Sequence, residues 1–325
     1  MPGAQERALR RRIGSVQNTK KITRAMELIA ATRVVKAQQA ARDARPYSER
    51  ITEVIRDLAS GGSATSHPLL RSTTGEGRVG IVVLSSDRGL AGAYNSSVIR
   101  AAEREIAAAR SAGRGYALVT IGRKAEGYFR FRNYDIAASF VGFTEKPTYE
   151  IARGIAATVV GLLEGDVDRI ELVYTRFISM GSQEVTVRRF LPLKTGRDGP
   201  TSAPSGPTAA FEFEPSPVAV LEALLPRYVE SRLFAALLEG AASELSARQR
   251  AMKAATDNAQ ELIIKLSRKM NQARQDAITT EIMEIISGAE ALGDDKGNDE
   301  DLLLDRMTSD PFPHALSRPH PHAAR

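Results

Sequence analysis

The hydrophobic pattern of residues 217–292 predicts one long helix. Apolar and small residues recur there at alternating spacings of four and three, which is the pattern of a coiled-coil seam. The seam positions are Phe234, Leu238, Ala241, Leu245, Arg248, Met252, Ala255, Ala259, Leu262 and Leu266. At 1.5 Å per residue the helix would be on the order of 110 Å long, so we expect a shaft or a scaffold element.

The seam shifts beyond Leu266 but does not end. It continues through Met270, Ala273 and Ala277, and then through Ile278, Ile282, Ile285 and Ala289. A shift of this kind changes the supercoil locally and leaves the helix intact.

Residues 5–58 carry a second amphipathic pattern, which predicts another long helix. Its apolar and small positions are Leu9, Ile13, Val16, Thr23, Met26, Ala30, Val34, Ala37 and Ala41. Pro46 should bend or interrupt this helix, because proline removes a backbone donor and clashes with the preceding turn. Two seam-bearing helices in one chain favour an antiparallel pair. The alternative is a homodimeric coiled-coil scaffold, in which each helix pairs with a second copy.

Between the two helices the pattern changes to short β-branched runs that alternate with helical ones. We expect strands at 79–84, 116–121, 169–175 and 184–193, and helices that end near Ser111 or span 122–131 and 149–163. This alternation with short connections indicates a small α/β, Rossmann-like domain with a partly parallel sheet. The predicted fold is therefore mixed: a long antiparallel coiled coil with an α/β domain inserted between its helices.

The composition shifts predict the domain boundaries. We expect an N-terminal coiled-coil helix at 1–60, the α/β domain at 61–215 and a C-terminal coiled-coil helix at 216–292. The Gly-, Pro-, Ser- and Thr-rich residues 196–208 predict a flexible loop inside the domain. The charged end at 293–325 predicts a disordered tail.

The composition excludes several kinds of chemistry. The 325 residues include no cysteine and four histidines. Disulfides, Cys-ligated zinc and thiol redox switching are therefore excluded for this chain. No apolar run reaches the roughly 18 residues that cross a bilayer. Because no Ser/His/Asp or paired-carboxylate arrangement can be assembled, we expect no catalytic site, no metal and no cofactor.

Positive charge is concentrated at the N-terminus. Residues 1–50 contain twelve Lys and Arg against four Asp and Glu, whereas the whole chain has a net charge of +6. These basic residues are spread around a seam rather than gathered on one face, so we expect no nucleic-acid partner. A basic amphipathic start is also typical of a transit peptide, but here the helical pattern continues well past the usual length.

The turn from Gly89 to Asn95 follows a predicted strand and opens a helix, which is where α/β folds bind phosphates. It lacks the Gly-Lys-Ser/Thr of a P-loop and the full spacing of a dinucleotide fingerprint. A nucleotide-dependent enzyme that uses Gly89 or Gly92 is one hypothesis, and a tight strand-to-helix connection is the simpler one. Asp87 and Arg88 are interpreted as a cap and a solvated charge rather than a catalytic pair.

Four segments together resemble one known family. They are residues 12–30 (RIGSVQNTKKITRAMELIA), 85–95 (SSDRGLAGAYN), 251–259 (AMKAATDNA) and the positions ARQ and IT within 273–279. In this order and spacing they resemble the gamma subunits of F-type ATP synthases, over about residues 5–292.

The resemblance implies a non-catalytic rotor subunit, the central stalk of a proton-transporting two-sector ATP synthase. Its implied partners are the alpha and beta subunits of the catalytic ring, the epsilon subunit and the membrane rotor ring of c subunits, with one copy of this chain per complex. The implied location is the cytoplasmic face of a bacterial cell membrane, as a peripheral protein.

The resemblance also implies partner-binding residues. Those matching the family's shaft contacts, with the beta subunit or between the helices, are Lys20, Lys21, Arg24, Met26, Arg248, Arg274, Gln275, Thr279 and Glu281. Phe211, Phe213 and Glu214 match a segment near the rotor ring and epsilon, and their alternative role is packing of the sheet onto the helix. Arg248 needs a carboxylate or carbonyl partner if it is buried in the seam, and otherwise would extend to solvent. Asp276 and Thr280 depart from the family's usual small residue and glutamine.

Overall fold

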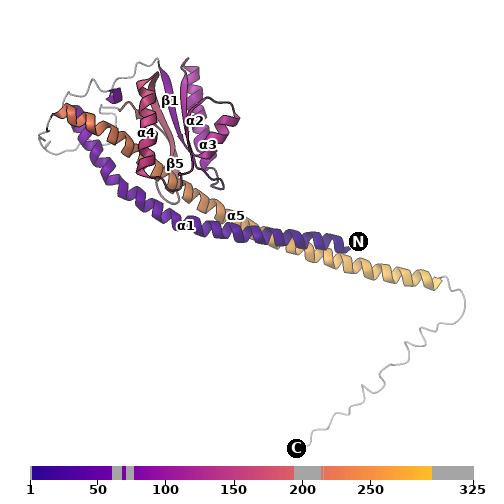
Figure 1. Cartoon of the computed structure of the whole chain (residues 1–325). Helices are drawn as coiled ribbons and strands as arrows, with labels where there is room; N and C mark the ends of the chain where they lie inside the picture. The colour runs from indigo at the N-terminus through magenta and orange to yellow at the C-terminus, as the bar shows by residue number, and fades with distance from the viewer. Residues whose placement is uncertain (1, 61–67, 71–76, 194–213, 215, 295–325) are drawn as a thin grey trace, which may run out of the picture. The chain divides into compact units, whose positions relative to one another are not determined.

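A computed structural model describes residues 2–60, 68–70, 77–193, 214 and 216–294 (Figure 1). The chain divides into two compact units. One is Gly14–Ile263, and the other comprises Met1–Ile13 with Ile264–Arg325. The predicted loop 196–208 lies outside the described residues, as does the predicted tail from 295 onward. In the part that the structure describes, no helix is both long and apolar enough to cross a membrane.

A five-stranded sheet forms the centre of the unit Gly14–Ile263. Along the chain the elements are β1 (Arg78–Leu84), α2 (Tyr94–Ser111), β2 (Tyr116–Ile121), α3 (Arg123–Phe131), β3 (Ile136–Phe140), α4 (Tyr149–Glu164), β4 (Val167–Phe177) and β5 (Gln183–Leu191), and a short 3-10 turn, Pro68–Leu70, precedes β1. The strand order is β3-β2-β1-β4-β5. The first four strands are parallel and β5 pairs antiparallel with β4. The predicted partly parallel, Rossmann-like sheet is therefore confirmed.

The strand β3 was not predicted. It is five residues long, lies at the edge of the sheet, and alternates half-buried with exposed positions. A short strand with small side chains (Ile-Ala-Ala-Ser-Phe) carries too weak an alternation to separate it from a loop. The other predicted strands and helices of the domain are present, and β4 extends beyond its predicted 169–175 at both ends.

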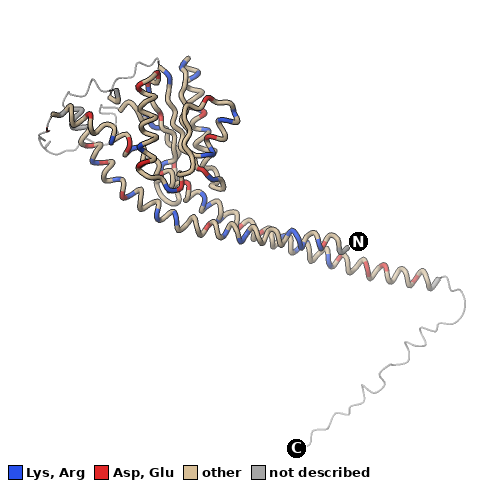
Figure 2. Tube along the Cα trace, viewed as in Figure 1, with Lys and Arg blue, Asp and Glu red and all other residues tan. Residues whose placement is uncertain are grey.

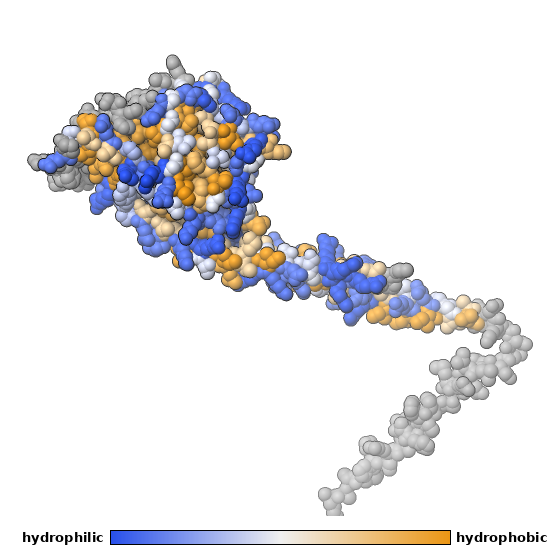
Figure 3. Space-filling model, viewed as in Figure 1, coloured by the Kyte–Doolittle hydropathy of each residue, from blue (hydrophilic) through white to orange (hydrophobic). Residues whose placement is uncertain are grey.

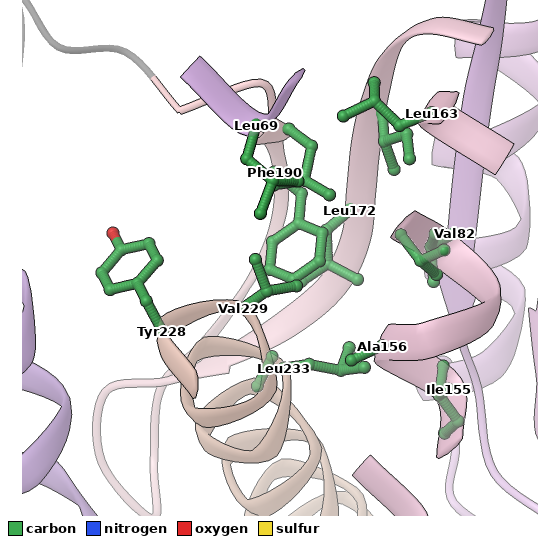
Figure 4. Close-up of a cluster of buried hydrophobic side chains, with 14 of the residues drawn as sticks. Leu69, Val82, Ile155, Ala156, Leu163, Leu172, Phe190, Tyr228, Val229 and Leu233 are labelled. Atoms are coloured by element: carbon green, nitrogen blue, oxygen red, sulfur yellow. The ribbon is translucent and has the colours of Figure 1, made fainter. Parts of the chain in front are cut away.

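The two faces of the sheet bury different helices. Val79, Ile81 and Val83 of β1 point into a cluster with α2 and α3. Val82 and Leu84 point the other way, into a larger cluster with α4 and the long C-terminal helix. Figure 4 shows this second cluster, in which Val229 and Leu233 of that helix approach Phe190 and Ala156. The alternation of successive side chains across a strand explains why each strand serves both clusters.

The two predicted long helices are present as α1 (Pro2–Ser60) and α5 (Pro217–Asp294). Within the unit Gly14–Ile263 they run antiparallel, because Thr23 contacts Thr256 while the earlier Lys20 contacts the later Gln260. Their pairing within one chain confirms the predicted antiparallel coiled coil.

Neither proline inside the long helices ends its helix. Pro46 lies within α1 and Pro226 within α5. Of the two outcomes expected at Pro46, a bend or an interruption, the helix is not interrupted, and the ribbon of α1 curves through its second half (Figure 1). Ile51 and Ile55, just beyond Pro46, are buried in the domain's core. This tertiary packing offsets the lost backbone hydrogen bond, which costs about 3 kcal/mol or more in an isolated helix.

The predicted seam is buried along its first part and exposed along its last. Of the predicted seam positions, those buried are Thr23, Ala30, Val34, Leu238, Ala241, Leu245, Arg248, Met252, Ala259 and Leu266. Leu262 is partly exposed, and Ile278, Ile282 and Ile285 are exposed. The apolar repeat therefore continues beyond the residues that the chain itself covers.

Candidate partner-binding surfaces

Four of the predicted partner-binding residues lie on α1. The Nζ of Lys20 donates to Oε1 of Gln260 on α5 at 2.5 Å, and Arg24 forms an ion pair with Glu27 at 2.8 Å. Lys21 is exposed and Met26 is half-buried. Lys21 and much of Arg24 are thus free to meet a partner, whereas Lys20 also joins the two helices.

The same part of α1 exposes large apolar side chains that sequence analysis did not single out. They are Ile22, Leu28, Ile29 and Val35. Ile22 and Ile29, two turns apart, lie on one face of the helix. Leu28 and Val35, also two turns apart, lie on the side of the helix that carries the basic side chains of Lys21 and Arg24, and such a mixed apolar and basic surface suits a protein partner with acidic groups. Figure 2 shows how closely blue residues follow one another along α1.

Arg248, the charged member of the predicted seam, is buried and paired. Only 7% of its side chain is exposed, so the alternative that it extends to solvent is wrong. One guanidinium nitrogen lies 2.9 Å from Oε1 of Glu145, and another lies 2.5 Å from Oε1 of Glu244. The need for a carboxylate partner was predicted correctly. The partner itself, Glu145, comes from the loop between β3 and α4 and could not be found from sequence spacing.

Glu145 also meets two further arginines. Its Oε2 accepts from Arg33 of α1 at 2.8 Å, and its Oε1 lies 3.4 Å from Arg88 in the loop after β1. The carboxylate therefore joins α1, α5 and the α/β domain. We call Glu145, Arg33, Arg88 and Arg248 the Glu145 junction.

The loop that carries Glu145 is fastened to the sheet by Asp87. One carboxylate oxygen of Asp87 accepts from the backbone N–H of Gly142 at 2.8 Å and the other from that of Thr144 at 3.0 Å. The carboxylate also accepts from the N–H of Arg123, at the start of α3. Burial would raise the pKa of Asp87, but these hydrogen bonds outweigh it and lower the pKa. The interpretation of Asp87 as a cap is consistent with these contacts.

The helix α5 packs across the ends of β1 and β4, next to the turn where a nucleotide was considered. Open α/β sheets bind ligands outside the carboxyl ends of their strands, where the strand order reverses, and here that point lies between β1 and β4. The hydroxyl of Ser243 donates to the carbonyl of Thr175 on β4 at 3.1 Å. At Gly240 an added Cβ would come 2.7 Å from Leu84 at the end of β1. This packing argues against the hypothesis of a nucleotide-dependent enzyme.

Glu244 is an ionisable group buried at this contact. Burial raises its pKa to about 7; the Arg248 guanidinium acts in the opposite direction, and the Glu145 carboxylate adds to the rise. Burial also raises the pKa of the neighbouring Tyr94, whose hydroxyl donates to the carbonyl of Gly240 at 3.2 Å. The contact between α5 and the domain thus includes a carboxyl group that changes its charge near neutral pH.

The remaining predicted shaft residues lie in the last part of α5. Arg274, Gln275, Thr279 and Glu281 are all exposed, as are Asp276 and Thr280. Exposed apolar side chains accompany them: Ile278, Ile282, Met283, Ile285, Ile286 and Leu292. Figure 3 shows hydrophobic residues along this part of the helix. An exposed apolar surface of this kind marks a site for a protein partner.

Of the three residues predicted to lie near the rotor ring, the structure describes only Glu214. Phe211 and Phe213 lie outside the described residues, and Glu214 is exposed. The assignment of these three residues stays a prediction. Among the described residues, no group of three acidic or histidine side chains could hold a metal ion.

The structure combines two paired long helices with an α/β domain, and one of these helices packs across the ligand-binding edge of the sheet. These features define a class of helical shaft proteins that present helix surfaces to partners. The sequence model of the family described as ATP synthase matches residues 5–292. The chain belongs to this family.

Curated relatives support the same assignment over nearly their whole length. The ATP synthase gamma chain of Frankia casuarinae is 50% identical over 294 residues, which are 89% of this chain and 98% of the relative. That of Mycolicibacterium smegmatis is 47% identical over 305 residues, with 89% of this chain and 98% of the relative covered.

Solved structures match the fold. A chain of the Euglena gracilis mitochondrial ATP synthase, solved with OSCP, F1 and c-ring, has a TM-score of 0.63 at 17% identity, covering 92% of this chain and 98% of that one. A chain from the central stalk and c-ring of the Tetrahymena thermophila enzyme has a TM-score of 0.56 at 24% identity, covering 72% and 99%. At these identities the likeness concerns the fold.

Proposed function

We propose that this chain is the rotor subunit of an F-type ATP synthase, the central stalk that transmits rotation between the membrane ring and the catalytic ring. The observation that carries the proposal is the match to gamma chains at about 50% identity over nearly their full length. The paired helices suit the role, because two helices that share a buried seam resist unwinding under torque. The chain itself contributes no catalytic group, and the reaction takes place in its partners.

The alpha and beta subunits are the proposed partners of the shaft. The basic and apolar surface on α1, with Lys20, Lys21, Arg24 and Met26, would face acidic segments of beta. The exposed apolar residues of α5 between Ile278 and Leu292 would be covered by the catalytic ring, alongside Arg274, Gln275, Thr279 and Glu281. Covering them removes apolar surface from water, which stabilises the complex by about 25 cal/mol per Å².

The α/β domain would contact the partners on the membrane side rather than the alpha and beta subunits. Phe211, Phe213 and Glu214 are proposed to meet the epsilon subunit and the ring of c subunits, which would hold the chain as a peripheral protein at the cytoplasmic face of a bacterial cell membrane. The domain boundaries at 60, 215 and 292 belong to the same proposal. One copy of the chain would serve each complex, and proton flow would drive its rotation.

A homodimeric scaffold is not supported. That alternative needs each helix to offer its seam to a second copy, whereas in Gly14–Ile263 the seams of α1 and α5 bury each other. The relatives give it no support either, since they are named as ATP synthase gamma chains.

The test is to co-express the chain with the alpha and beta subunits of the same organism, followed by gel filtration and an ATPase assay. We expect one copy per alpha–beta ring in an active complex. A stable self-dimer that ignores alpha and beta would overturn the proposal.

The variant Met26→Lys tests the assigned surface on α1. The added charge should impair ATP-driven proton pumping more than assembly, because it alters the contact with beta without removing buried structure. Normal pumping by the assembled variant would count against the position given to Met26. Thr32→Lys, at an exposed position on α1, is the control for added charge.

A further inference from the structure

We infer that the Glu145 junction transmits load between the two shaft helices and the α/β domain, with Glu145 as the positioning residue. The inference rests on the proposed rotor function and adds the contact through which the domain turns with the shaft. Its basis is that a single carboxylate accepts from α1 at one oxygen and from α5 at the other.

The geometry at Glu145 opposes rotation in a way that apolar packing does not. Arg33 of α1 donates to Oε2 at 2.8 Å and Arg248 of α5 donates to Oε1 at 2.9 Å, so each helix binds a different oxygen of the carboxylate. Hydrophobic contacts are non-directional and tolerate sliding. Charge-assisted hydrogen bonds are short and directional, and they weaken when the donor is displaced.

The burial of the junction strengthens it. Arg248 and Glu145 have 7% and 19% of their side chains exposed, which limits screening by water and salt. Arg248 also donates to the carbonyl of Gly89 at 3.5 Å, and its second carboxylate partner is Glu244 of its own helix. The guanidinium therefore contacts the loop after β1 through Gly89 and the loop after β3 through Glu145.

The path from Glu145 into the sheet is continuous. Thr144, the residue before it, donates its backbone N–H and its hydroxyl to Asp87, at 3.0 and 2.9 Å. Asp87 follows β1 closely and also accepts from the N–H of Arg123, where α3 begins. A displacement of either shaft helix is thus passed through Glu145 and Thr144 to the central strand of the domain.

The test uses complexes assembled from the full chain with its alpha, beta, epsilon and membrane partners. Glu145→Gln keeps the shape and removes the charge that the three arginines share. We expect assembly and ATP hydrolysis close to wild type, with protons pumped per ATP hydrolysed lowered about threefold or more because the directional contact is lost. Glu126→Gln is the matched control, because it breaks an ion pair confined to α3.

Arg33→Gln is the second variant, and it cannot be dismissed as a folding defect because half of the Arg33 side chain is exposed. It should lower the same ratio, and the double variant Arg33→Gln/Glu145→Gln should lower it no further than Glu145→Gln, since both act through one contact. Pumping per ATP at the wild-type level in assembled Glu145→Gln and Arg33→Gln complexes would overturn the inference.

A covalent replacement separates mechanics from charge. The chain has no cysteine, so Arg33→Cys/Glu145→Cys introduces the only two thiols in it. Joining them with a short bis-maleimide should restore pumping per ATP, and an unlinked pair that pumps normally, or a linked pair that stays impaired, would refute the proposed role of Glu145. If the wild-type chain did not assemble with alpha and beta, the proposed function itself would fail, which is a different result.

Discussion

The two parts of α5 have similar apolar repeats and opposite surroundings. From Leu221 to Ala259 its apolar side chains are largely buried against α1 and the α/β domain, and Leu225 has 0% of its surface exposed. From Ile278 to Leu292 they are exposed, and Ile285 has 71% exposed. A seam pattern therefore reports that a helix face will be covered, and it does not report whether the chain itself or a partner covers it.

The polar residues differ in the same way. In the first part some of them are buried and paired, as Arg248 and Thr256 are, whereas in the second part Arg274, Gln275 and Glu281 are exposed. The first part is thus built for the stability of the chain and the second for assembly. Four matched pairs of substitutions, one member in each part, test this contrast.

The largest difference is expected for truncated apolar side chains. Leu225→Ala should lower the free energy of unfolding of the full chain by about 2–5 kcal/mol, because it leaves a cavity in the core. Ile285→Ala should change it by less than about 0.5 kcal/mol, because that side chain is exposed. Urea unfolding followed by circular dichroism gives both numbers, and equal losses would remove the contrast.

The next difference concerns buried charge and pH. The pKa of Glu244 rises from 4.5 to about 7 on folding, so its carboxyl is protonated in the folded chain and ionised in the unfolded one between these values. The stability that it contributes is complete below about pH 4.5 and is lost as pH rises through 7.

Glu244→Gln should therefore flatten this decline and raise the free energy of unfolding at pH 8 by about 2 kcal/mol. Unfolding curves at several pH values between 5 and 8 measure it. Glu281→Gln, at an exposed position, should leave the pH profile unchanged, and an unaltered slope in Glu244→Gln would contradict the assignment.

Two helical glycines should respond with opposite signs. A Cβ at Gly240 would lie 2.7 Å from the buried Leu84, so Gly240→Ala should cost about 1–3 kcal/mol by overpacking, reduced by the better helix propensity of alanine. Gly288 has nothing within 4 Å of such a Cβ. Gly288→Ala should stabilise the helix by about 0.5–1 kcal/mol. Thermal unfolding resolves the two signs, and stabilisation by both would mean that α5 does not press on β1.

The smallest difference concerns hydroxyl groups. The hydroxyls of Thr23 and Thr256 lie 2.8 Å apart in the buried seam, where they fix the register of the two helices. Thr256→Val should cost about 1 kcal/mol, because the Thr23 hydroxyl loses that partner. Thr279→Val should be close to neutral for the isolated chain. A neutral Thr256→Val would show that the apolar seam sets the register alone.

Most of the fold could be predicted because its signals are local or periodic. The seams of α1 and α5 extend over many turns, and β1 and β2 are short, mostly apolar runs with several β-branched residues. The edge strand β3 lacked such a signal. At Pro46 the sequence left a bend and an interruption open, because local propensity favours a break, while the burial of Ile51 and Ile55 favours continuation.

The candidate site likewise contains residues that local signals predict and residues that they do not. The seam predicted that a buried Arg248 would need a carboxylate or carbonyl partner, because that need follows from the residue and its position alone. Glu145 could not be predicted, since it lies 103 positions away in a loop whose path depends on Asp87 and Thr144. The exposed apolar side chains of Ile22 and Ile29 could not be recognised from the sequence, because they recur with the same helical period as the buried face of α1.

The filling of the sheet's crevice by α5 has a consequence for how this fold is regulated. A helix joined to the same chain competes for its place at a fixed and high effective concentration, whereas a free metabolite competes only at its cellular concentration. A small molecule would have to displace Gly240 and Ser243 from the ends of β1 and β4 before it could bind there. Any ligand at the ends of β1 and β4 would therefore have to compete with a segment of the chain itself.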